Sequence, residues 1–234
     1  MVLSTTFLML GECNLQAIKR ILLILFIFNK YYVKYLTMSK ERIRWIVTTG
    51  ALAAIEVILQ IIGNVVAFGP ISINLSLIPI AVGAILMGPW CGLFLGAVNG
   101  IAVILAPSTL ATFMPLNAFG TILICMLKAM AAGFLSGLLF LVFKGKKIEI
   151  VGMIICSLII PIINTSIFIG GCYLFFKDWL TSTAETLGFA NPFLCLILVI
   201  IGWNFIFEFS TSIVFSPTIC KVVQIARNKQ KASA

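Results

Sequence analysis

Residues 79–100 read PIAVGAILMGPWCGLFLGAVNG, and this stretch predicts how two helices of the chain meet. It contains a row of four glycines spaced four residues apart, namely Gly88, Gly92, Gly96 and Gly100. In lipid, apolar contact alone gives helices little net attraction, and small residues stabilise a pair by letting the backbones approach closely. The row therefore predicts a helix pressed tightly against a neighbour. The GPW break at 88–90 predicts a tight turn, so that two spanning helices form a hairpin.

The composition predicts an all-α membrane protein. Hydrophobic residues make up 62% of the 234 residues and charged residues only 10%. Backbone polar groups in lipid must be satisfied internally, which leaves helices or closed barrels. The long apolar runs lack the period-2 alternation of a barrel. Because a spanning helix needs about 20 residues, the length suits one compact polytopic bundle without a separate soluble domain.

The sequence lacks the residues that several function classes need. Histidine is absent, which removes Ser-His catalysis and HExxH zinc sites. No GxxxxGK[ST] phosphate loop is present, so ATP hydrolysis by the usual route is not expected. The net charge of +9 lies in clusters beside the apolar runs, where it meets anionic lipid and not nucleic acid. We therefore expect no enzyme, no metal and no cofactor bound by this chain.

The chain divides into two expected parts. Residues 1–37 contain only a short apolar run at 21–28, flanked by basic residues and too short to span a bilayer. This segment is consistent with an interfacial helix or a weak signal segment, but our hypothesis is that translation starts at Met38 and that 1–37 are an N-terminal extension that is not translated. Residues 38–234 then form the membrane domain.

Six spans are expected, at 43–66, 71–88, 90–106, 117–143, 149–176 and 193–220. Clusters of Lys and Arg precede the first span, separate the fourth from the fifth and follow the sixth. With an even number of spans all three clusters fall on one side, which the positive-inside rule makes the cytoplasm. The N- and C-termini are therefore expected to be cytoplasmic.

Polar side chains within these spans predict a binding pocket open to the outer face. Ionisable groups inside a membrane are costly and usually face a cavity, and Glu56, Lys128 and Glu208 are three such groups. Glu56 begins a polar stripe that recurs every fourth residue, through Gln60 to Asn64. Interhelical hydrogen bonding that fixes the bundle is the alternative for single asparagines. The candidate substrate-binding residues are Asn64, Asn74, Asn99, Asn117, Lys128, Asn164, Asn204 and Glu208.

From Met38 onward the sequence resembles the substrate-binding membrane component, or S component, of energy-coupling factor (ECF) vitamin transporters. The segments that carry the resemblance are INLSLIPIAVGAILMGPWCGLFLGAVNG at 73–100, PLNAFGTILICMLKAMAAGFLSGLLF at 115–140, PIINTSIFIGGCYLFF at 161–176 and GWNFIFEFSTSIVFSP at 202–217. The resemblance implies six helices and a vitamin bound near the extracellular face of a bacterial plasma membrane. Among the vitamins that this family serves, which include pantothenate, riboflavin and folate precursors, a membrane lysine at Lys128 suits a carboxylate or phosphate-like group and favours an anionic vitamin such as pantothenate. The alternative is that Glu208 neutralises Lys128.

The resemblance also implies partners. Such components work with a transmembrane coupling subunit and two ATP-binding subunits, so ATP is used by the partners. Their small-residue motif on the first helix, which meets the coupling subunit, is similar to Gly50, Ala51 and Ala54 here, with glycine in place of an alanine. A secondary transporter driven by an ion gradient is the alternative, with Glu56 or Glu208 as the ion site. Against it, no two-half repeat with paired broken helices is evident.

Overall fold

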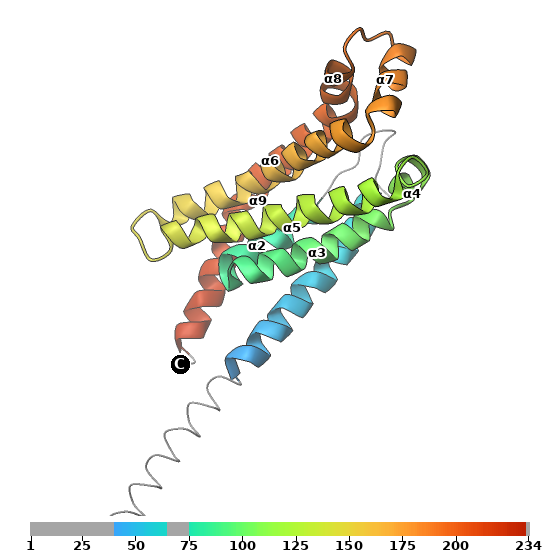
Figure 1. The fold of residues 1–234 in the computed structure, drawn as a ribbon. Coiled ribbons are helices and arrows are strands. Elements are labelled where there is room, and N and C mark those ends of the chain that lie inside the picture. The colour runs from blue at the N-terminus through green and yellow to red at the C-terminus, as the bar shows by residue number, and fades with distance from the viewer. Residues whose placement is uncertain (1–39, 65–74, 233–234) are drawn as a thin grey trace, which may run out of the picture. The chain divides into compact units, whose positions relative to one another are not determined.

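The computed structural model describes residues 40–64 and 75–232. By its contacts the chain divides into residues 1–47 and 48–234, and the packing below is that of the second unit. The regular structure within the described ranges is helical, as the composition predicts. The elements are a first helix Lys40–Asn64, α2 (Leu77–Met87), α3 (Pro89–Ile104), α4 (Pro107–Thr112), α5 (Ala118–Phe143), α6 (Glu149–Phe175), α7 (Lys177–Thr186), α8 (Pro192–Cys195), the π-helical turn η1 (Leu196–Ile201) and α9 (Gly202–Ala232) (Figure 1).

Four helical stretches in the described ranges are long and apolar enough to cross a membrane: Lys40–Asn64, Ala118–Phe143, Glu149–Phe175 and Pro192–Ser216. The α2 and α3 helices are apolar as well, but they have 11 and 16 residues and fall short of about 20. The first four residues of the second predicted span, 71–74, lie outside the described residues. The proposed N-terminal extension, 1–37, lies outside them as well. The number of spans and the side of the termini therefore stay predictions.

The predicted hairpin is confirmed between α2 and α3. The α2 helix ends at Met87, and Gly88 has a φ of 98°, a conformation that L side chains rarely adopt. The Gly88 amide donates to the carbonyl oxygen of Ala84 at 3.1 Å, and Pro89 starts α3 at a position where no amide proton is needed. In one respect the sequence prediction was wrong: Gly88 forms the turn and is not an interior residue of the helix that carries the other glycines.

The remaining glycines of the row pack α3 against α5 (Figure 1). A Cβ added at Gly92 would collide with the backbone of Gly133, and one at Gly96 with the backbone of Ala129. Gly100 meets Cys125 in the same way. The facing residues on α5 are also spaced four apart, so two rows of small residues run antiparallel and bring the two backbones into contact.

The α2 helix is the most buried element and contacts α3, α5, α6 and α9. Helix α5 also packs on α6, where the Ser136 hydroxyl donates to the carbonyl oxygen of Cys156 at 2.8 Å. The first helix is joined to α3 by a contact of 3.3 Å between Thr49 Oγ1 and Cys91 Sγ. These contacts hold the helices in the positions from which their polar side chains converge.

The two connections expected as outer loops, 106–116 and 177–192, each contain a short helix. Pro107 starts α4, and α7 follows α6 directly at Lys177. The apolar residues of α7 recur at helical spacing, and Leu180 and Ala184 are buried while Ser182 between them is exposed. Both short helices contribute residues to the cavity described next.

Candidate functional site

A cavity of about 490 Å³ is lined by the short helices α4 and α7 together with the first helix, α5, α6 and α9. Its volume falls in the range of small-molecule sites, about 300–1,000 Å³. The first helix contributes Gln60 and Asn64. The other main contributors are α5, α6 and α9, and each presents residues one helical turn apart, so that one face of each helix forms a wall.

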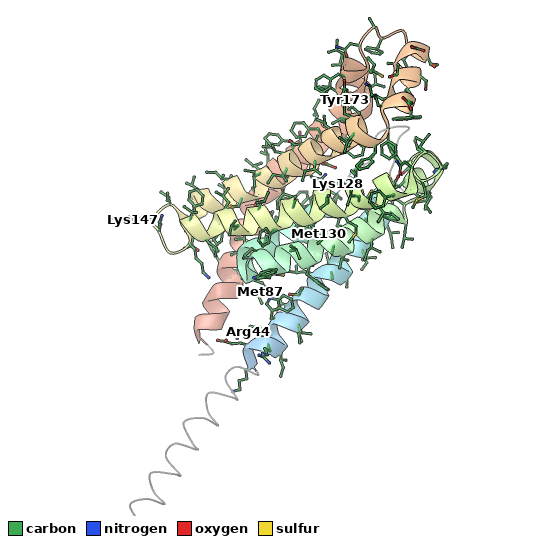
Figure 2. The ribbon with its side chains drawn as sticks, viewed as in Figure 1. Arg44, Met87, Lys128, Met130, Lys147 and Tyr173 are labelled. Atoms are coloured by element: carbon green, nitrogen blue, oxygen red, sulfur yellow. The ribbon has the colours of Figure 1, made fainter. Side chains whose placement is uncertain are left out.

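Two of the three predicted intramembrane ionisable groups, Lys128 and Glu208, line this cavity. Lys128 is half-buried on α5, and its Nζ lies 5.0 Å from the centroid of the Phe168 ring on α6, in a cation–π contact. Figure 2 shows Lys128 on α5, in the part of that helix beside α6. Glu208 is buried on α9, with Asn204 one turn before it. A cation and a carboxyl group on two different helices of the lining make the cavity suitable for a polar molecule with more than one recognition group.

Asn164 on α6 is a buried polar residue of the cavity lining with an unsatisfied acceptor among the described residues. Its side chain is 4% exposed, and its Oδ1 atom accepts no hydrogen bond from the described residues. A buried acceptor without a partner costs about 1–3 kcal/mol. Because Asn164 lines the cavity, an N–H or O–H group of a bound molecule would remove that cost.

An aromatic cluster covers one side of the cavity. The ring of Phe113, after α4, lies 6.0 Å from Phe168, 5.3 Å from Phe176 and 5.4 Å from Trp179 between centroids. All four rings line the cavity, and Phe205 of α9 does as well. The cluster joins α4, α6 and α7, so it ties the two short helices together and gives a bound molecule an apolar contact surface.

The structure brings five of the eight predicted residues together on this cavity: Asn64, Lys128, Asn164, Asn204 and Glu208. Asn99 does not line it; its side chain is 1% exposed and donates to Ser76. Asn117 does not line it either, because its Oδ1 accepts from the Gly120 amide at 2.9 Å and caps α5. Asn74 lies outside the described residues. The role of these residues in binding stays a prediction.

Glu56 belongs to the predicted stripe but not to the cavity lining. Its side chain is fully buried, and neither carboxyl oxygen makes a hydrogen bond with the described residues. The Asn99 amide lies nearby, outside hydrogen-bond geometry. The stripe itself is confirmed, since Gln60 Nε2 donates to Asn64 Oδ1 at 3.2 Å on the same helix face.

The sequence prediction missed the aromatic cluster and the hydroxyl residues around it. Thr109, Thr112 and Thr183 line the cavity from α4 and α7. The signal for them was weak, because both segments were interpreted as loops, and only the helical spacing of Phe176, Leu180 and Ala184 indicated a helix. Within the described residues, no group of three His, Cys, Asp or Glu side chains lies together in a way that would hold a metal ion.

The coupling-subunit residues predicted on the first helix lie on its exposed side. Gly50, Ala51 and Ala54 are all exposed, whereas Glu56 and Gln60 on the opposite side are buried. A Cβ added at Gly50 would meet no atom within 4 Å. This side therefore presents small side chains that nothing in the described part of the chain covers.

Comparison with known families gave a match. The family model described as "ECF transporter, substrate-specific component" matches residues 44–219, which includes every described residue that lines the cavity. Comparisons with curated proteins and with solved structures found no match.

Proposed function

The chain belongs to the family of substrate-specific components of ECF transporters, and we propose that it captures a vitamin or a related small micronutrient at the extracellular side for ATP-driven uptake. The family membership makes it a transporter component. It favours this function over the secondary transporter considered from the sequence. The proposal adds three statements to the family membership: that the substrate is a vitamin or related micronutrient, that it is captured at the extracellular side, and that ATP drives its uptake.

The observation that carries the proposal is the buried, unpartnered Oδ1 of Asn164 on a cavity of about 490 Å³. A polar atom in that state is stabilised by a ligand that donates a hydrogen bond to it. The aromatic cluster offers apolar contact for the rest of the ligand, and the amides and charges offer orientation. A few polar groups in a largely apolar pocket are typical of small-molecule sites.

Lys128 supports a ligand with a negative group. A cation at membrane depth is retained mainly where it has a function, and Lys128 is the cation among the described residues that line this cavity. Its contact with Phe168 uses the ring face and leaves ammonium hydrogens for an acceptor. A carboxylate vitamin of moderate size, such as pantothenate, matches this chemistry.

The partners follow from the family and from the first helix. We propose that the exposed side with Gly50, Ala51 and Ala54 meets a transmembrane coupling subunit, because small residues allow close helix contact in lipid. Two ATP-binding subunits would supply the hydrolysis for which this chain has no phosphate loop. In this proposal the chain crosses a bacterial plasma membrane six times with both termini in the cytoplasm.

Mass spectrometry of the molecule retained through purification tests the proposal. The parent chain is expected to retain a micronutrient, and Asn164→Leu is expected to lose most of it because leucine has a similar volume but no acceptor. Ser166→Ala is the matched control, since Ser166 is exposed on the same helix and its hydroxyl donates to the backbone carbonyl oxygen of Ile162, one turn earlier in that helix. Equal retention by the parent and Asn164→Leu would contradict the assignment of this cavity.

A further inference from the structure

A chain of side-chain hydrogen bonds leads from the interior of the bundle to the cavity. Asn99 Nδ2 on α3 donates to Ser76 Oγ, just before α2. Ser76 Oγ donates to Gln60 Oε1 at 2.9 Å, and Gln60 Nε2 donates to Asn64 Oδ1 at 3.2 Å. We call these four residues the polar chain. Asn99, Ser76 and Gln60 are buried, at 1%, 0% and 8% exposure, so water does not compete for these bonds.

In the structure the polar chain runs in one direction, and this direction is set at its inner end, where the Asn99 amide nitrogen donates to Ser76. The Ser76 hydroxyl has one proton, which goes to Gln60, so its oxygen accepts from Asn99. With its oxygen occupied, Gln60 presents its amide nitrogen to Asn64. A reversed Asn64 amide would set two N–H groups against each other. The oxygen of Asn64 is therefore used, and its Nδ2 group, which only donates, is the polar atom to which the hydrogen bonds of the described residues give no partner.

Asn64 and Gln60 line the cavity together with Lys128. Resting on the proposed function, we propose that the polar chain fixes Asn64 as a hydrogen-bond donor, so that Asn64 and Lys128 select a ligand with an acceptor group, above all a carboxylate. Asn164 Oδ1 and Glu208, which accept hydrogen bonds, serve N–H or O–H groups elsewhere on the same ligand. Ser76 and Asn99 touch no ligand and act as positioning residues.

This arrangement discriminates against analogues because a bound ligand covers the half-buried Asn64 and Lys128, and a donor covered by a ligand that has no acceptor is left without a partner. A neutral analogue that lacks the carboxylate leaves the Asn64 and Lys128 donors without their acceptor, and sites built on hydrogen bonds reject such analogues strongly. A single bond to a charged acceptor corresponds to a change in affinity of about tenfold to a hundredfold. The polar chain sets the sign of this preference, since an acceptor at position 64 would repel a carboxylate.

Matched acid and neutral probes test the inference on the purified full chain. The probes are pantothenate with panthenol, nicotinate with nicotinamide, and biotin with biotin amide, with Kd measured by calorimetry. At least one acid is expected to bind the parent about tenfold or more tightly than its neutral counterpart. In Asn64→Asp one oxygen still accepts from Gln60 while the other faces the cavity, so the acid is expected to lose about tenfold or more and its counterpart much less.

Two further variants keep the comparison sharp. Gln60→Glu accepts from Ser76 and also from Asn64, which turns the Asn64 oxygen toward the cavity, so the same loss is expected. Asn191→Asp is the matched control: Asn191 is exposed, lies outside the cavity and accepts from the Phe193 amide at 2.9 Å, as an aspartate can. Its acid-to-neutral ratio is expected to equal that of the parent.

The inference is overturned if the parent binds no acid more tightly than its neutral counterpart, or if Asn64→Asp and Gln60→Glu, eluting as folded protein, keep the parent's ratio. A retained micronutrient without an acceptor group would overturn the polarity assignment and leave the proposed function standing. Absence of any retained micronutrient, with none of the six probes bound, would contradict the proposed function as well.

Discussion

Replacing Gly96 by alanine tests whether backbone contact between α3 and α5 holds the bundle together. A Cβ at Gly96 would lie 2.6 Å from the Cα of Met130, whereas ordinary Cβ contacts begin at 3.4 Å. The two backbones would therefore have to separate by about 0.8 Å or more at this point, since the carbonyl group of Ala129 would lie closer still. The close approaches on either side, at Gly92 and Gly100, would open as well, because the helices are rigid over one turn.

The expected loss is about 1–3 kcal/mol, the usual effect of one extra methyl group in a tightly packed interior. Alanine also favours a helix over glycine, by about 1 kcal/mol, in the opposite direction. Gly170→Ala isolates that gain, because Gly170 is exposed on α6 and an added Cβ there meets nothing within 4 Å. The difference between the two variants then corresponds to the cost of crowding, and at about 2–4 °C per kcal/mol it is several degrees in Tm.

Thermal unfolding in detergent with a thiol-reactive dye measures this difference. The six cysteines in the described part of the chain are buried, so they react only as the bundle opens. Gly96→Ala is expected to melt several degrees below Gly170→Ala. If both variants melt at the same temperature, the two small-residue rows do not hold α3 and α5 together and the packing argument is wrong.

Two predictions concern ligand recognition and coupling. Lys128→Met keeps an apolar stem of similar length and removes the charge, so the Kd for a carboxylate ligand is expected to rise about tenfold or more; an unchanged Kd in calorimetry would remove Lys128 from the site. Ala54→Trp fills the exposed small-residue side of the first helix, and it is expected to leave ligand binding intact while abolishing uptake by the full complex in proteoliposomes. Normal uptake would exclude a docking role for that side.

The packing of α3 on α5 shows how much the spacing of small residues in the sequence can predict. The four-residue spacing of Gly92, Gly96 and Gly100 predicted a close helix contact, which the structure confirms. The partner was not predicted, although Cys125, Ala129, Gly133 and Gly137 on α5 have the same spacing. Spacing places residues on one face of a helix, but the face of another helix that meets it depends on all the contacts of the bundle at once.

The polar residues divide in the same way. Depth in an apolar span identified Lys128, Asn164 and Glu208, because an ionisable or amide group there needs a partner whatever the fold. Asn99 had the same signal, yet it belongs to the polar chain and not to the cavity lining. Its partner is Ser76, a residue that sequence reasoning did not single out, since one serine beside an apolar run carries no distinctive pattern.

Four features could be predicted from the sequence alone: the helical membrane class, the hairpin at Gly88, the polar stripe on the first helix and the family. Each of these follows from local composition, spacing or motif, which helix geometry converts directly into structure. The packing of α3 on α5, the aromatic cluster that α4 and α7 place on the cavity, and the bond from Gln60 to the Asn64 oxygen came from the tertiary structure alone. These depend on which atoms from distant segments come within hydrogen-bond or van der Waals distance, and that is a property of the packed bundle.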